Sequence, residues 1–275
     1  MTDRRFDVDG VPLDHPHGAW SVMQDGTSVG AGAARRVQRQ DSAFRHGARP
    51  SRDVRAGVGK ETLAMIVRDV DPQTGISAGF GQMWRNLADL RALLAPWGRV
   101  EPRLLGLVPE AVREPELRYV TRIEVSSAGG QVNEISPKRW VVPFTLDVID
   151  AFWRDAEPIV VTQASASALR GGSAPIVDPL FMVPGQGDAM RVRIRDHVSG
   201  QWIAYDGDVP TNQYVRIDPN SETAYVVANA HAWTGGSEHA AGVTTGPGGF
   251  ELQPAVEFSS TVPGVRLRAA KAYEW

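Results

Sequence analysis

The sequence predicts a mainly β protein in two parts, an α+β domain at residues 1–163 and an all-β domain at residues 164–275. Three observations favour this division. Segments with the two-residue alternation of strands occur in both parts, whereas a helical period occurs only in the first. In the second part, turn dipeptides recur roughly every 8–12 residues, which is typical of a β-sandwich or barrel. Between the parts, a run of Ser, Ala and Gly separates two apolar segments.

The first part begins with a predicted hairpin, because valines flank Asp9-Gly10, a dipeptide favoured in tight two-residue turns. Residues 24–60 are rich in Gly and Arg and have little apolar periodicity, which predicts a long excursion or a flexible arm. The apolar run at 63–67 then predicts a short buried strand.

A single helix is predicted next, because four apolar residues recur at helical spacing and form one stripe. They are Met83, Leu87, Leu90 and Leu94. Trp84 and Ala88 are expected to widen this face, and the polar residues, Asn86 among them, are expected to lie mostly away from it. Pro96 should end the helix, because proline lacks the N–H and its ring clashes with the preceding turn.

Alternating patterns predict the remaining strands. In the first part they cover residues 119–125 and 139–148. In the second part they cover 190–198, 201–205, 214–217, 225–227 and 265–268, with turns at Ser199-Gly200, Asp206-Gly207 and Asp218-Pro-Asn220.

The two parts meet in a segment that we call the seam, residues 140–179. Its first half ends in an aromatic and acidic run, "DAFWRD", in which Phe152 and Trp153 are expected to anchor the first domain. The Ser/Ala/Gly stretch from Ser165 to Ser173 is expected to supply slack, so that the seam acts as a hinge.

Composition excludes several classes of protein. The net charge is −3, from 29 basic and 32 acidic residues. The chain therefore has no strong overall charge that would attract nucleic acid or membranes. The chain has no cysteine, which excludes disulfides and thiolate metal sites. No apolar run approaches the roughly 20 residues of a membrane span. The N-terminus lacks the apolar core of a signal peptide, so we expect a soluble protein made in a cytoplasm.

No motif predicts catalysis. Gly30-Ala-Gly32 lacks the third glycine and the βαβ context of a dinucleotide loop, and Asp69-Val-Asp71 lacks the glycine and glutamate of a calcium loop. Two histidine-containing groups, His15-Pro-His17 and His231 with Glu238 and His239, have metal-binding side chains in settings typical of exposed turns. Nucleophile motifs and phosphate loops are absent. We therefore expect no enzyme, no metal site and no cofactor.

The arginines of the arm are candidate interface residues. Seven of them lie between Arg35 and Arg55, against only two acidic residues. Clustered arginine can bind nucleic-acid phosphates, but aromatic residues are limited to Phe44 and no nucleic-acid motif is present. Pairing with carboxylates across a subunit interface is the favoured interpretation. The candidates are Arg35, Arg36, Arg39, Phe44 and Arg45 of the arm, together with Phe152 and Trp153 further along the chain.

Eight tryptophans also need an explanation. Tryptophan is favoured in cores and at interfaces, and core packing accounts for most of them. Trp202 and Trp233 are candidates for a surface on which a sugar ring stacks, and the terminal Trp275 is a candidate for docking between subunits.

The order of several short motifs along the chain resembles that of the distal tail proteins of siphophages, often labelled minor tail proteins in phages of actinobacteria. The resemblance covers most of the chain and depends on order and spacing, since no single motif is specific. It includes Val8-Asp-Gly10, the Gly/Arg-rich arm, the strand at 62–67, "MWRNLADLRALLAP", "DAFWRD", "APIVDP", "SGQWIAYDG", "HAWTGG" and "GPGGFELQP".

The resemblance implies a split β-barrel with one packed helix, followed by a galectin-like β-sandwich. It also implies a ring of six copies in the tail tip, or baseplate, of the virion, joining the tail tube to the tail-tip hub and letting DNA pass. The implied partners are further copies, the tail tube protein, a hub or tail-associated protein and the tape measure protein, with no membrane and no sequence-specific nucleic acid. The arm would then reach a neighbouring subunit or ring.

The alternative is a carbohydrate-binding module that contacts the host cell wall. The sugar-binding patterns of galectins, His-x-Asn-Pro-Arg and Trp-x-x-Glu-x-Arg, are absent from the sequence. Carbohydrate binding is therefore not implied by the resemblance, and the second domain is expected to space or dock other tail-tip proteins.

Overall fold

The structure is a computed structural model that describes residues 4–28, 35–41, 48–56, 59–95, 102–128, 132–150, 152–176, 178–239, 242–246 and 250–273. Its contacts divide the chain into two compact units, Met1–Ala156 and Glu157–Tyr273. Residues 157–163, which we expected in the first domain, lie in the second unit, because the strand at Ile159–Thr162 pairs within it. Among the described residues, no helix combines the length and apolarity that a membrane span requires.

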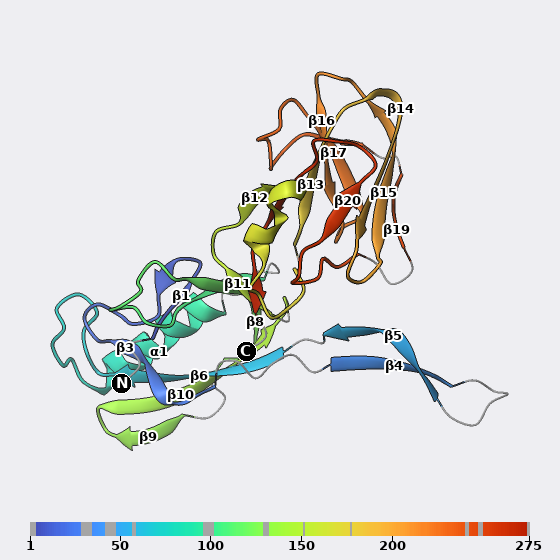
Figure 1. The fold of residues 1–275 in the computed structure, drawn as a ribbon. Coiled ribbons are helices and arrows are strands. Elements are labelled where there is room, and N and C mark those ends of the chain that lie inside the picture. Colours follow the sequence, from blue (N-terminus) through green and yellow to red (C-terminus); the bar gives the residue numbers. More distant parts are fainter. Residues whose placement is uncertain are drawn as a thin grey trace. The chain divides into compact units, whose positions relative to one another are not determined.

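The first unit is an antiparallel sheet with one helix packed against it (Figure 1). The strands follow the order β2-β1-β7-β8-β10-β6-β3, with β9 paired to β10 and β11 paired to β8. Their bounds are β1 Arg5–Val8, β2 Val11–Pro12, β3 Trp20–Ser28, β6 Gly59–Arg68, β7 Arg103–Val108, β8 Tyr119–Ala128, β9 Asn133–Ser136, β10 Arg139–Val148 and β11 Trp153–Asp155.

The predicted hairpin at the N-terminus is confirmed. In the β1–β2 pair, Val8 lies opposite Val11, and Asp9 and Gly10 both have positive φ, at 51° and 81°. Positive φ at both central residues is the geometry of the type I′ turn, which matches the twist of the strands that it joins.

The helix, α1 Phe80–Leu94, is confirmed with its apolar stripe, but its buried face is rotated from the expected one. Asn86 is fully buried, whereas Trp84 is half-exposed and Ala88 is exposed. The reason is hydrogen bonding: the Asn86 amide donates to the carbonyl oxygens of Arg68, at 2.8 Å, and Val70, at 2.7 Å. A buried amide with its partners satisfied ties α1 to the end of β6. Pro96 lies outside the described residues.

The predicted arm contains regular structure. β4 Arg35–Asp41 and β5 Ala48–Ala56 form a separate two-stranded antiparallel sheet. The expected bounds of 24–60 are too wide. Residues 24–28 belong to strand β3 and residues 59–60 belong to strand β6, and these two strands pair with each other in the main sheet. The excursion from the main sheet therefore runs from the end of β3 to the start of β6.

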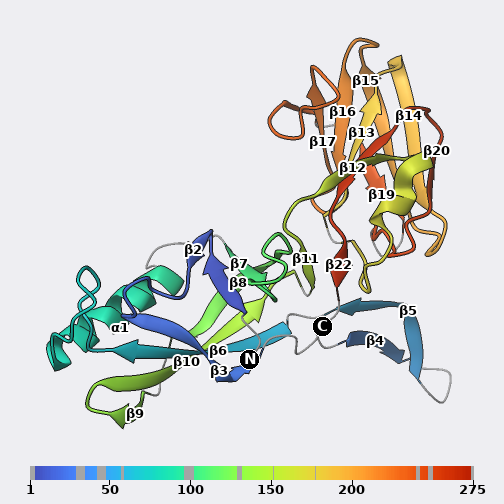
Figure 2. The ribbon, with the colours of Figure 1, turned by 60° about the vertical axis from the view of Figure 1, so that its left-hand side comes forward.

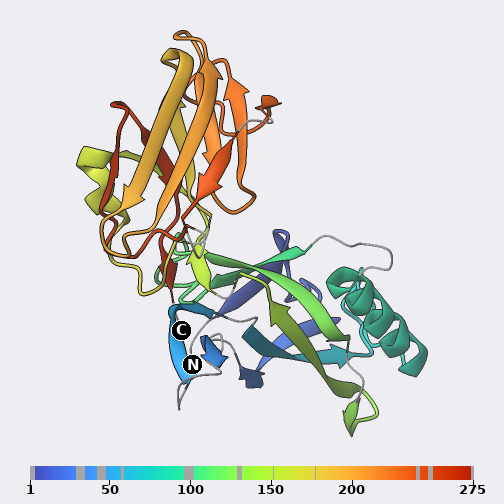
Figure 3. The same ribbon diagram turned by 90° about the vertical axis from the view of Figure 1, so that its right-hand side faces the viewer.

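The second unit is a sandwich of two antiparallel sheets (Figures 2 and 3). One sheet has the order β12-β21-β13-β16-β17-β18, and the other has the order β19-β15-β14-β20. Alternate residues from both sheets, such as Phe181 and Val215 from one and Ile194 and Ile203 from the other, form a single buried core. The bounds are β12 Ile159–Thr162, β13 Leu180–Pro184, β14 Gly187–Asp196, β15 Trp202–Val209, β16 Tyr214–Asp218, β17 Thr223–Val227, β18 Ser237–His239, β19 Val243–Thr245, β20 Phe258–Ser260 and β21 Arg266–Ala269; a short strand, β22 Ala272–Tyr273, follows β21.

Two expectations for this unit are wrong. Asp206-Gly207 is not a turn: β15 continues through it to Val209, because Asp206 pairs with Arg191 and Gly207 with Met190. The Ser/Ala/Gly stretch is not slack either. Its first half belongs to a 3₁₀ helix, η1 Gln163–Leu169, whose Ala166 and Leu169 are buried in the sandwich core.

The start of the helix η1 is fixed by local hydrogen bonds. The Thr162 backbone N–H donates to Ser165 Oγ at 2.9 Å, as one half of a capping box. Alanine and serine here serve to cap and bury a helical turn, so the segment is an ordered part of the second unit rather than a hinge.

The first half of the seam is held to β8 by a buried carboxylate, Asp150, whose side chain is 1% exposed. The Arg122 backbone N–H donates to Asp150 Oδ2 at 3.0 Å, and the Arg122 guanidinium donates to Oδ1. Arg154 Nη2 lies 3.7 Å from Oδ2. The carboxylate thus fixes the turn that leads from β10 into β11.

We expect Asp150→Asn to lower the free energy of unfolding of the first unit by about 2 kcal/mol, because a hydrogen-bonded charge is replaced while the Arg122 guanidinium remains. Urea denaturation of the full chain measures this change. Asp147→Asn is the matched control: Asp147 is more exposed and lies 4.0 Å from Lys60 Nζ, so its loss should cost no more than about 0.5 kcal/mol. Equal effects of the two substitutions would contradict the role of Asp150.

The second unit should lose stability in alkali because of Tyr205, which is 1% exposed. Burial raises the pKa of Tyr205, and the charges of Asp208 and Asp206 raise it further. Below about pH 10 the phenol is protonated in the folded and unfolded chains alike. Above that pH the unfolded chain ionises first, so the free energy of unfolding falls as pH rises. Calorimetry between pH 8 and pH 11 should show this fall, and Tyr205→Phe should reduce it; an unchanged fall would exclude Tyr205 as its source.

Candidate functional site

The arm residues predicted for an interface are only partly described. Arg35, Arg36 and Arg39 lie on β4, where their register partners on β5 are Ala56, Arg55 and Pro50. Phe44 and Arg45 lie outside the described residues. Their role at an interface remains a prediction, as does that of Trp275, which also lies outside the described residues.

The two aromatic residues of the seam have different environments. Trp153 is 3% exposed in the core of the first unit, and its Nε1 donates to Glu61 Oε1 at 3.0 Å. Phe152 is half-buried, and its carbonyl oxygen accepts a hydrogen bond from Thr121 Oγ1 at 3.1 Å. Within the subunit, both residues therefore hold the seam against the sheet.

An exposed aromatic surface lies on α1, and the sequence pattern did not identify it. Phe80 and Trp84 are 53% and 50% exposed, one helical turn apart. Their rings pack edge to face, 6.2 Å between centroids, and both contact the buried Trp140 of β10 at 5.3 and 4.7 Å. We call Phe80 and Trp84 the α1 aromatic surface. Large exposed aromatic rings held rigidly from below are typical of protein–protein contacts.

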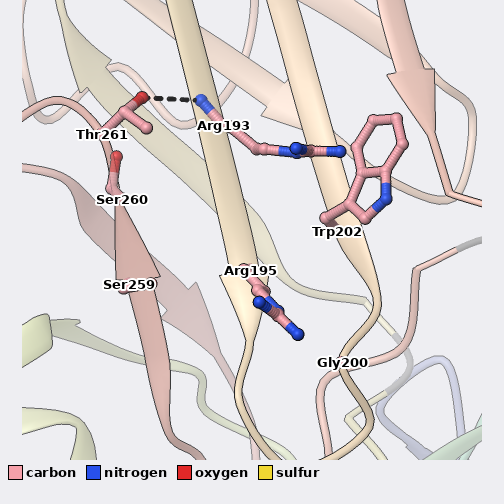
Figure 4. Close-up of a pocket in the computed structure, with 7 residues that line it drawn as sticks. All are labelled: Arg193, Arg195, Gly200, Trp202, Ser259, Ser260 and Thr261. Carbon is pink, nitrogen blue, oxygen red and sulfur yellow. Dashed lines mark hydrogen bonds between the residues drawn. The ribbon is translucent and has the colours of Figure 1, made fainter.

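A cavity of about 500 Å³ lies on the outer face of the β19-β15-β14-β20 sheet (Figure 4). Residues from β14, β15 and β20 and the turns beside them form its wall: Arg193, Arg195, Gly200, Trp202, Ser259, Ser260 and Thr261. Arg195 is paired in register with Trp202 on one side and Ser259 on the other, so these three residues form a row across the sheet. Trp233 is half-buried in the segment between β17 and β18 and does not belong to this wall.

The Trp202 indole is already in contact with protein groups. The Arg193 guanidinium carbon lies 4.0 Å from the ring centroid, a cation–π contact. Gly246 approaches the pyrrole side so closely that an added Cβ would lie 3.0–3.3 Å from three indole atoms. A sugar ring that stacked on the Arg193 face would have to displace the guanidinium. The geometry at Trp202 therefore favours polar recognition by arginine over sugar stacking.

His15, His17 and His231 lie in loops, whereas Glu238 and His239 lie on β18 rather than in the turn that the sequence predicts. The His17 backbone N–H donates to His15 Nδ1 at 3.2 Å, and burial together with the neighbouring His17 lowers the pKa of His15. In the described part of the chain, no group of three His, Asp or Glu side chains is placed to hold a metal ion.

Comparisons with known proteins give the fold. No protein-family model matches the chain, and no curated protein matches it. The crystal structure of the SPP1 Dit protein (gp 19.1), described as a paradigm of the hub adsorption apparatus in phages that infect Gram-positive bacteria, matches with a TM-score of 0.56 and 13% identity over 98% of each chain. Two structures of the phage P2 baseplate in its activated conformation, with Sr and with Ca, match at 9% identity over 99% of each chain. Their TM-scores are 0.44 and 0.43.

At this low identity the match to SPP1 Dit concerns the fold, and it extends over nearly the whole of both chains. The predicted fold class is confirmed as mainly β, with open sheets rather than a closed barrel among the described strands and with a galectin-like second domain. The resemblance inferred from sequence motifs is confirmed at the same level: the chain has the fold of a phage distal tail (Dit) protein.

Proposed function

We propose that this protein is a structural component of a bacteriophage tail tip, located in the virion. The observation that carries the proposal is the end-to-end match in fold with SPP1 Dit, whose description names a phage hub adsorption apparatus. A shared fold is evidence by analogy, because function depends on sites. The exposed surfaces of the first unit give a second line of support that does not depend on the match in fold.

Two features of the first unit support self-association. The α1 aromatic surface exposes two rings that a buried tryptophan holds in place, which is the kind of anchor found at the centre of protein interfaces. The β4–β5 sheet is separate from the main sheet, and the arm that contains it is rich in arginine. An arginine-rich arm suits pairing with carboxylates of a neighbouring copy.

In this proposal, several copies form a ring through their first units. The ring joins the tail tube to the tail-tip hub and leaves a lumen for DNA. The partners are further copies of the chain, the tail tube protein, the hub protein and the tape measure protein. The arm, with Arg35, Arg36, Arg39, Phe44 and Arg45, reaches the neighbouring copy, and the role of the protein is mechanical rather than enzymatic.

Light scattering and negative-stain imaging of the purified full chain test the ring. We expect a closed ring of several copies, six by the family resemblance, formed either alone or on isolated tail tubes. A folded monomer at high concentration that forms no ring on tail tubes would overturn the proposal.

The contribution of the α1 aromatic surface is tested by Trp84→Ser. We expect at least tenfold weaker self-association, because an exposed aromatic anchor is lost, while the first unit stays folded. Val112→Ser is the matched control, since Val112 is 74% exposed in the same unit but is remote in sequence from α1. Equal association of the Trp84 and Val112 variants would show that the ring, if formed, uses another surface.

A further inference from the structure

The outer face of β14 carries three arginines in different charge environments. Arg191, Arg193 and Arg195 are exposed and alternate with the buried Val192 and Ile194, as the two-residue period of a strand requires. Arg191 has an acidic partner: its Nε lies 3.1 Å from Asp206 Oδ2 on β15.

Arg193 and Arg195 have no ion pair within the described part of the chain, and both line the cavity. The residues next to them on β15, on β20 and just after β20 are uncharged: Ala204 and Thr261 lie beside Arg193, and Trp202 and Ser259 lie beside Arg195. Residues two apart on a strand have Cα atoms about 7 Å apart, so the two positive charges lie close together on one face. Their mutual repulsion would be relieved by an anion bound between them.

The Arg193 guanidinium is positioned before any ligand binds. It stacks on the Trp202 ring at 4.0 Å, which uses the face of the guanidinium and leaves the N–H groups at its edge available as donors. A planar fork of N–H donors matches the two oxygens of a carboxylate or phosphate. Because stacking limits the freedom of this long side chain, less entropy is lost when the anion binds.

Hydroxyl groups form the opposite wall (Figure 4). Thr261 Oγ1 accepts a hydrogen bond from the Arg193 backbone N–H at 2.9 Å, and Ser260 Oγ accepts one from the Val262 backbone N–H at 3.1 Å. These contacts fix both oxygens and leave the hydroxyl hydrogens able to donate. Ser259 lies in register with Arg195. Hydroxyls beside a charged pair suit a ligand that is both anionic and rich in hydroxyl groups.

We propose that this cavity binds the phosphate or carboxylate group of an anionic saccharide, with Arg193 and Arg195 holding the oxyanion and the hydroxyls of Ser259, Ser260 and Thr261 contacting the sugar. The volume of about 500 Å³ accommodates a small saccharide and lies within the usual range of ligand sites. Because Trp202 holds Arg193 rather than a sugar ring, the charge and not stacking selects the ligand. The site lies in the second unit and is independent of ring formation by the first.

Saturation-transfer NMR with small ligands tests the proposal on the full chain. The probes are glucuronate for the carboxylate, glycerol 1-phosphate for the phosphate and methyl glucoside as the neutral counterpart. We expect saturable binding of at least one anionic probe, and no binding of methyl glucoside. The probe that binds tells which oxyanion the site takes.

Arginine variants locate the binding. Arg195→Gln and Arg193→Gln should each weaken binding at least tenfold, because one fork of donors is lost. Arg191→Gln is the matched control: it removes the same charge from the same strand, but from a residue already paired with Asp206, so binding should change less than about twofold. Thermal unfolding confirms that each exposed substitution keeps the fold.

Three results would overturn the proposal. One is the absence of binding for both anionic probes at millimolar concentration. The second is an equal loss in the Arg191 and Arg195 variants, which would indicate a diffuse electrostatic effect rather than a site. The third is binding of a glutamate tripeptide at least as tight as that of the saccharides, which would assign the cavity to an acidic protein segment.

Discussion

The pairing of β6 with β10 organises the first unit. The two strands are in register over their whole lengths, from Arg68 opposite Arg139 to Gly59 opposite Val148. β3 pairs with the free side of β6, β8 pairs with the other side of β10, and α1 packs on β6. The core of the unit is built on these two strands, because alternate residues such as Leu63, Met65 and Phe144 are fully buried. A break in this ladder would therefore disturb β3, β8 and α1, which pair with or pack on these two strands.

The same register determines where the two non-core segments leave the sheet. Gly59 is the first residue of β6 after the arm, Val148 is the last residue of β10 within the seam, and these two residues are paired. The point where the chain enters β6 after the arm and the point where it leaves β10 consequently lie side by side at one end of the ladder. Asp150 secures this end by binding Arg122 of β8.

Sequence patterns predicted the elements that local chemistry determines, and they failed where a distant partner decides. The helical stripe from Met83 to Leu94 and the strand at 139–148 follow from periodicity alone. The burial of Asn86 does not, because it depends on two carbonyl groups that the end of β6 presents to the helix. Likewise, Asp206-Gly207 has turn composition, but pairing with β14 keeps it in a strand. The burial of Ala166 and Leu169 in the sandwich core similarly overrides the loop-like composition of the Ser/Ala/Gly stretch.

The candidate sites, too, could be predicted from the sequence only in part. They also differ in the interaction that would drive binding at each. Alternation placed Arg191, Arg193 and Arg195 on one face of a strand, but only the register with β15 shows which of them meets a carboxylate. The unpaired arginines would act through charge, which salt screens. The α1 aromatic surface would act through burial of apolar area, which salting-out ions strengthen. Ionic strength should thus affect the two surfaces in opposite directions, so the proposed assembly through the first unit and the proposed anion binding by the second can be distinguished in one preparation of the intact chain.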